Sequence, residues 1–178
     1  MFDKELVGRL YQEAGMFKPV NLGILYHSMG VTNVAGFTAR QLNRKGVAVD
    51  VALVENGGML HDIGKMFDGT PRGHTVEGVA FLKRQGVDER IIRLVQRHQV
   101  WVFQPGEIPD PDSWEEKLVF LGDMAFQDSI VSVKERVADL LERYARYMPE
   151  TRKKWLQEKS QEIYREISEI ISPQILPF

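Results

Sequence analysis

The chain has 178 residues, 43% hydrophobic and 27% charged, a composition typical of one globular domain. Its formal net charge is −2, with basic and acidic residues interspersed, so we expect no long nucleic acid and no membrane surface as a partner. The absence of cysteine excludes disulfides, thiolate ligands and a cysteine nucleophile. Without a signal-peptide pattern or an apolar run of about 18 residues, we expect a cytoplasmic protein.

Apolar residues recur with the helical period along nearly the whole sequence, and no convincing alternation of period two occurs. The pattern predicts an all-α fold. The predicted helices cover residues 2–14, 21–43, 51–61, 74–85, 88–98, 113–124, 133–147 and 149–171. We expect a single domain over residues 1–178, with a core at about 21–128 and a C-terminal helical extension at about 133–171.

Four residues mark the third predicted helix and its ends. Asp50 is the expected N-cap, because its side chain can accept a hydrogen bond from the first turn. Gly57 and Gly58 each cost a helix about 1 kcal/mol relative to alanine, which favours close approach of another helix or of a functional site. Gly64, just beyond the helix, is expected to provide a left-handed exit.

Histidines and aspartates form the most informative pattern. The chain contains only four histidines, and each lies on or beside an apolar helical face or at a helix end, as two of the aspartates do. An isolated His61-Asp62 pair would more often be a hydrogen-bonded core pair. In a compact bundle, however, several helices can each bring one ligand to a common point. The six candidate metal ligands are His27, His61, Asp62, His74, His98 and Asp123.

A carboxylate has two oxygens and can bridge two cations, whereas adjacent helical residues diverge by about 100°. The simplest assignment gives one metal His27, His61, Asp62 and Asp123, and a second metal Asp62, His74 and His98. Each ion keeps open positions for water or substrate. With nitrogen and oxygen ligands only, the divalent ion is expected to be Mn, Fe, Mg, Co or Ni.

The segment His61-Asp62-Ile63-Gly64-Lys65, with the other ligands in the same order, resembles the HD-domain superfamily in its HDIG form. The resemblance extends from about Ile24 to Ala125. It implies an all-helical HD-domain bundle, metal ligation by the six residues named, and hydrolysis of phosphoesters or phosphoanhydrides. The pattern is similar to that of small stand-alone HDIG proteins, and the Gly-Tyr-Pro motif of cyclic dinucleotide phosphodiesterases is missing.

Within this resemblance, Asp62 and Lys65 are the predicted catalytic residues. Asp62 bridges the metals and orients the attacking water, while Lys65 holds a substrate phosphate; alternatively, Lys65 only complements a helix end. Arg72 and Arg97 are predicted to help bind the same anion, although a solvated arginine is the commoner outcome. The apolar stripe of the last helix packs either on the domain or on a second subunit, which leaves a homodimer open.

The leading hypothesis is a two-metal phosphohydrolase acting on a nucleotide or another small phosphoester. A mixed-valent diiron oxygenase of the same superfamily, acting on a small phosphonate or polyol, needs nearly the same ligands and is the alternative. A non-catalytic signalling or scaffold domain is a third reading, and the complete ligand set argues against it.

Overall fold

The computed structural model describes residues 2–16, 21–67, 70, 73–98, 110–173 and 176. Its helices are α1 (Lys4–Glu13), α2 (Leu22–Arg44), α3 (Val51–Leu60), α4 (Gly73–Arg84), α5 (Glu89–Arg97), α6 (Trp114–Ala125), α7 (Val133–Tyr144) and α8 (Glu150–Ile170), with 3₁₀ turns η2 (Ile63–Met66) and η3 (Ala145–Tyr147). In these residues the only β pairing is an isolated bridge between Phe126 and Ile130. The predicted all-α fold is confirmed.

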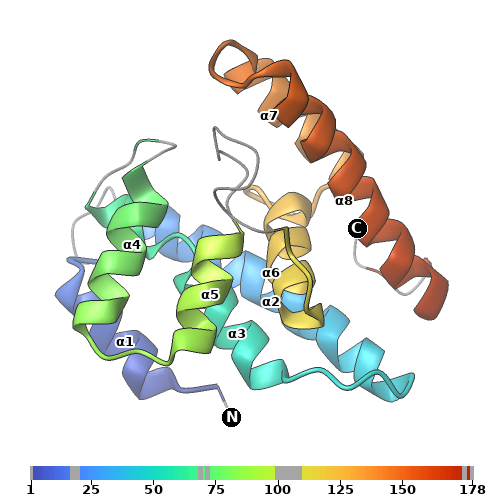
Figure 1. The fold of residues 1–178 in the computed structure, drawn as a ribbon. Coiled ribbons are helices and arrows are strands. Elements are labelled where there is room, and N and C mark those ends of the chain that lie inside the picture. The colour runs from blue at the N-terminus through green and yellow to red at the C-terminus, as the bar shows by residue number, and fades with distance from the viewer. Residues whose placement is uncertain are drawn as a thin grey trace.

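Helix α3 lies between α1 and α2 and also packs against α5 and α6 (Figure 1). Two clusters of buried apolar side chains meet along it. One joins α1, η2, α4 and α5 to the end of α3, and the other joins α2, α6, α7 and α8 to Val54. Leu53 packs against both clusters. The mostly apolar sequence of α3 therefore reflects burial on both sides.

Close packing around α3 explains its two glycines. A Cβ atom on Gly57 would lie 2.4 Å from Cδ1 of Leu94 in α5, and one on Gly58 would lie 3.1 Å from Cα of Thr32 in α2. The expectation of close approach is therefore confirmed. The predicted N-cap is confirmed as well, because the Asp50 carboxylate accepts a hydrogen bond from the Leu53 amide at 3.0 Å.

Gly64 has a different role from the one expected. Its φ angle is not positive, so the prediction of a left-handed exit is wrong. A Cβ atom at this position would instead lie 1.7 Å from the carbonyl oxygen of His74 and 2.5 Å from the amide nitrogen of Gly78. Turn η2 thus packs directly on the backbone of α4, and this contact fixes where His74 lies.

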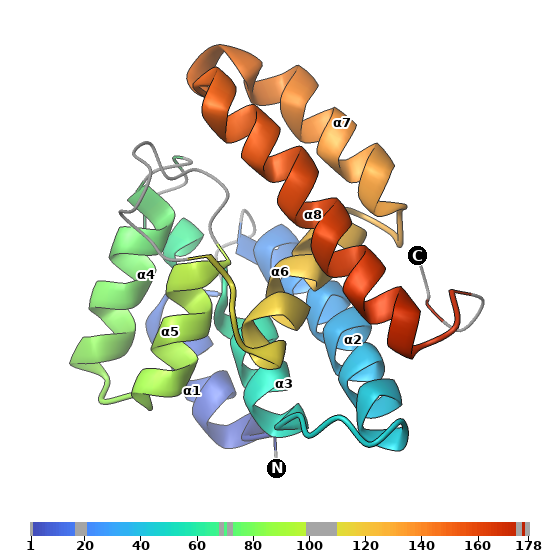
Figure 2. The same cartoon turned by 45° about the vertical axis from the view of Figure 1, so that its right-hand side comes forward.

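Helices α7 and α8 form an antiparallel pair that lies across α6 and α2 (Figure 2). The stripe of α8 is buried against the core, with Leu156, Ile163 and Ile167 each 0% exposed. It therefore packs on this chain, and the predicted boundaries of the core and the extension stay predictions. None of the helices in the described ranges has both the length and the apolar character needed to cross a membrane.

We predict that Gly64→Ala lowers the free energy of unfolding by about 3 kcal/mol, the upper end for an overpacked site, because backbone atoms would have to move. Gly8→Ala is the matched control. Gly8 lies within α1, and nothing lies within 4 Å of a Cβ placed there. That variant should gain about 0.5–1 kcal/mol. Equal stability of the two variants in denaturant titrations would contradict the packing role of Gly64.

Candidate metal centre

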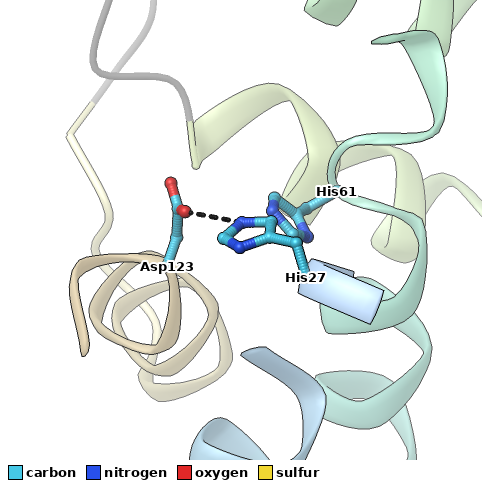
Figure 3. A group of neighbouring side chains, drawn as sticks. All are labelled: His27, His61 and Asp123. Atoms are coloured by element: carbon cyan, nitrogen blue, oxygen red, sulfur yellow. Dashed lines mark hydrogen bonds and ion pairs between the residues drawn. The ribbon is translucent and has the colours of Figure 1, made fainter. Parts of the chain in front are cut away.

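All six predicted metal ligands are described, and the structure brings them together. They come from five helices or helix ends: His27 from α2, His61 and Asp62 from the end of α3, His74 from the first turn of α4, His98 from the end of α5, and Asp123 from α6. Figure 3 shows the His27 ring between Asp123 and His61. Segments that lie 96 residues apart in sequence thus meet at one point.

His61 and Asp62 both face this point at the end of α3. His61 is the C-cap and keeps helical dihedral angles (φ −54°, ψ −39°), whereas Asp62 departs from them (φ −103°, ψ 10°) as the chain turns into η2. The divergence of about 100° between adjacent helical residues is therefore altered at Asp62. Nε2 of His61 lies 3.3 Å from Oδ2 of Asp62.

Each histidine directs its Nδ1 atom at a backbone carbonyl oxygen. The partners are Gln127 for His27 at 3.4 Å, Gly58 for His61 at 2.7 Å, Thr70 for His74 at 3.1 Å and Val95 for His98 at 2.5 Å. A carbonyl oxygen only accepts, so Nδ1 carries a proton, and in the neutral imidazole it is the only protonated ring nitrogen. The lone pair then lies on Nε2, which is the arrangement found in metal-ligating histidines.

The four Nε2 atoms face the carboxylates. His74 and His98 lie 3.5 and 3.7 Å from Oδ1 of Asp62, His61 and His27 lie 3.3 and 3.6 Å from Oδ2 of Asp62, and His27 lies 3.1 Å from Oδ1 of Asp123. The two oxygens of Asp62 therefore face different pairs of histidines. This is the geometry expected of a bridging carboxylate.

The donor set fits divalent metal ions. Nitrogen and carboxylate lone pairs that face each other repel, so a positive charge is required between them. Nε2 of His61 is buried and makes no hydrogen bond within the described part of the chain. Two groups have ligand atoms within 4.8 Å of one another: His27, His61 and Asp123, and Asp62, His74 and His98. Each group could hold one ion.

Both aspartates favour the ionised form. Burial alone would raise the pKa of Asp62, but the charges of His61 and Lys65 outweigh it and hold that pKa well below its usual range. Burial also opposes ionisation of Asp123, and the contact with His27 nevertheless lowers its pKa. The centre therefore offers two carboxylates to a cation.

The pKa values of the buried histidines shift in different directions. Burial lowers the pKa of His98 to about 3 and also lowers that of His74. Burial lowers the pKa of His61 as well, but the neighbouring Asp62 outweighs it and the net shift is upward. His74 and His98 are thus neutral near pH 7, the form that ligates a metal. Protonation of His74 and His98 therefore does not supply the positive charge needed opposite Oδ1 of Asp62.

The predicted substrate-binding residues have different surroundings. Nζ of Lys65 contacts Oδ2 of Asp62, at the edge of the centre. The Arg97 guanidinium pairs with Glu116 at 2.7 Å and Asp112 at 3.0 Å, contacts that join α5 to α6, and its substrate role stays a prediction. Arg72 lies outside the described residues.

Sequence reasoning missed one basic residue near the centre. Nη2 of Arg136, in α7, lies 4.0 Å from Oδ1 of Asp123. The helical period could have identified it, because Arg136 is adjacent to the buried positions Val133, Val137 and Leu140 of α7. A cation on the boundary of a buried stripe needs an anionic partner inside.

A comparison with protein families matches the HD-domain model over residues 24–125, more than half of the chain. The chain belongs to the HD-domain family. Membership confirms the predicted superfamily and, with it, the broad class of metal-dependent hydrolases. The matched segment contains all six candidate ligands.

The ribonuclease Y relatives that this HD domain matches are much longer than it is. It is 41% identical to the ribonuclease Y of Thermosipho melanesiensis over 76 residues, 42% of this chain and 14% of that protein. Identity to a ribonuclease Y of Thermus thermophilus is 31% over 112 residues, 62% of this chain and 16% of that protein. The chain thus matches a small part of these relatives.

A solved structure shares the fold of this HD domain. The HD domain of the L. monocytogenes phosphodiesterase PgpH, in complex with cyclic-di-AMP, aligns with a TM-score of 0.55 at 16% identity, covering 93% of this chain and 98% of that one. Because the alignment extends well beyond residues 24–125, it also includes helices that follow the matched family segment.

We predict that Asp62→Ala releases both metal ions, since it removes the bridge, whereas His61→Ala and His98→Ala each mainly release one. The measurement is metal content per chain after equilibration with Mn²⁺ and desalting. Asp128→Asn, an exposed aspartate close to Asp123, is the control and should bind as the unmodified chain does. Retention of both ions by Asp62→Ala would contradict the bridge.

Proposed function

We propose that this HD domain is a two-metal phosphohydrolase that acts on a nucleotide or another small phosphoester. One observation carries the proposal: the two oxygens of Asp62 face separate pairs of histidines, His27 with His61 and His74 with His98. A site with a single ion would need only the first pair and the two aspartates. The presence of a complete second set supports two ions.

The residues of the chain have distinct roles in this proposal. Divalent ions held here would polarise a phosphoryl oxygen and lower the pKa of a coordinated water. Asp62 orients that water through its carboxylate, and the four backbone-anchored imidazoles keep the ligand geometry fixed. Lys65 binds a phosphate oxygen of the substrate as a flexible point charge.

Exposure differs across the centre and indicates where a substrate enters. His61, Asp62, His74 and His98 are at most 3% exposed. The side chains with solvent access are His27 at 16%, Asp123 at 14% and Lys65 at 38%. A substrate therefore approaches from the side of the His27 and Asp123 group, where Lys65 also lies.

The relatives support phosphoester chemistry in general. By its name, ribonuclease Y cleaves RNA, and PgpH is a phosphodiesterase whose HD domain was solved with cyclic-di-AMP. For this chain we propose a small phosphorylated substrate and not a long nucleic acid, because the net charge of −2 provides no extended positive surface.

The test is phosphate or nucleotide release from a panel containing nucleoside mono- and triphosphates, dinucleoside polyphosphates, cyclic dinucleotides and a short RNA, with each metal added in turn. We expect turnover of at least one small member. Asp62→Ala should reduce the rate at least about a thousandfold, and Lys65→Met about tenfold to a hundredfold, since it removes one charged hydrogen bond. Inactivity on every member with both ions bound would contradict the proposal.

The same assay run without oxygen separates the hydrolase from the diiron oxygenase. Hydrolysis uses water and should proceed at the same rate under aerobic and anaerobic conditions. Oxygen consumption coupled to substrate loss, with an electron paramagnetic resonance signal of mixed-valent iron, would instead favour the oxygenase.

A further inference from the structure

Arg136 of α7 contacts the centre through a guanidinium that is only partly satisfied. Its side chain is 13% exposed. Nη1 pairs with Oδ2 of Asp139 at 3.2 Å, and Nη2 lies 4.0 Å from Oδ1 of Asp123, beyond hydrogen-bonding distance. Nε is buried and has no hydrogen-bond partner among the described residues. A guanidinium has five N–H donors, so most of them remain available.

Asp123 does not satisfy this arginine. Its Oδ1 already faces Nε2 of His27 at 3.1 Å, and it belongs to the first group of candidate metal ligands. Binding to a metal ion would neutralise more of the negative charge of Asp123. A partly buried arginine that faces a carboxylate committed elsewhere has unused capacity to bind an anion.

The position of Arg136 matches the open side of the centre. Lys65 contacts Asp62, and Arg136 lies beside Asp123, so the two cations border the two carboxylates. His27 links the carboxylates, at 3.6 Å from Asp62 and 3.1 Å from Asp123. An anionic group entering on this side would meet a positive charge at each aspartate.

We propose that Arg136 is a substrate-binding residue, whose guanidinium binds phosphoryl oxygens beside Asp123 while Lys65 binds the same substrate beside Asp62. The proposal rests on the phosphohydrolase function and extends it. It also gives a role to the helix α7, which lies outside the segment that matches the family. Two flanking cations favour a phosphoryl group that carries more than one negative charge.

A purely structural role is the competing explanation, in which Arg136 only holds α7 through Asp139. The chain offers a matched control for it. Arg143, on the same helix, pairs with the other oxygen of Asp139 at 2.7 Å and is 50% exposed. Arg143→Gln removes an arginine and a contact to Asp139 without touching the centre.

The experiment measures binding of inorganic phosphate to the full chain with Mn²⁺ by isothermal titration calorimetry, together with metal content and melting temperature. Arg136→Gln should weaken phosphate binding at least about tenfold with both ions retained, because a charged, forked hydrogen bond is lost. Arg143→Gln should bind within about twofold of the unmodified chain. On a hydrolysed ester, Arg136→Gln should raise KM more than it lowers kcat.

Unchanged phosphate affinity in Arg136→Gln, with both ions bound, would overturn the proposal. If that variant loses metal or unfolds, Arg136→Lys decides, since it keeps the charge beside Asp123 but not the fork. Affinity weakened at least about threefold with normal metal content supports the assignment, and full affinity overturns it. Failure of the unmodified chain to bind phosphate or to hydrolyse any ester would instead reject the phosphohydrolase function itself.

Discussion

The structure depends on one buried carboxylate. Asp62 is 2% exposed and ionised, surrounded by four imidazole nitrogens between 3.3 and 3.7 Å away and by the ammonium of Lys65. An ionised carboxylate in this position costs several kcal/mol unless positive charge compensates it. The ammonium of Lys65 pairs with Oδ2, one of the two oxygens of Asp62. The other oxygen faces two neutral histidines, and this imbalance is the physical reason for a metal centre.

The helices are packed closely so that their ends can meet around Asp62. Glycines in α3 admit Leu94 from α5 and the backbone of α2, and Gly64 admits the backbone of α4. Each close approach moves one ligand-bearing segment toward the centre. The carbonyl groups that anchor His61, His74 and His98 lie three or four residues before each of them, and the carbonyl that anchors His27 belongs to Gln127, after α6. The fold thus fixes both the position and the tautomer of each ligand.

The order and type of the ligands could be predicted from the sequence, because few polar residues interrupt the apolar helical faces. The helices themselves followed from period and caps, as at Asp50. Other features depend on tertiary contacts that no local pattern specifies. The role of Gly64 required the path of α4, and the shared orientation of His61 and Asp62 required the turn of the chain at Asp62. The helical period places Arg136 beside the buried stripe of α7, but its approach to Asp123 depends on the position of that helix.

Anomalous X-ray scattering from crystals of the full chain grown with Mn²⁺ would test the bridging role of Asp62. We expect two manganese peaks about 3.5–4 Å apart. One should be bonded to Oδ2 of Asp62 with His27, His61 and Asp123, and the other to Oδ1 of Asp62 with His74 and His98. A single peak, with Nε2 of His74 and His98 free of metal, would contradict the bridged two-metal centre.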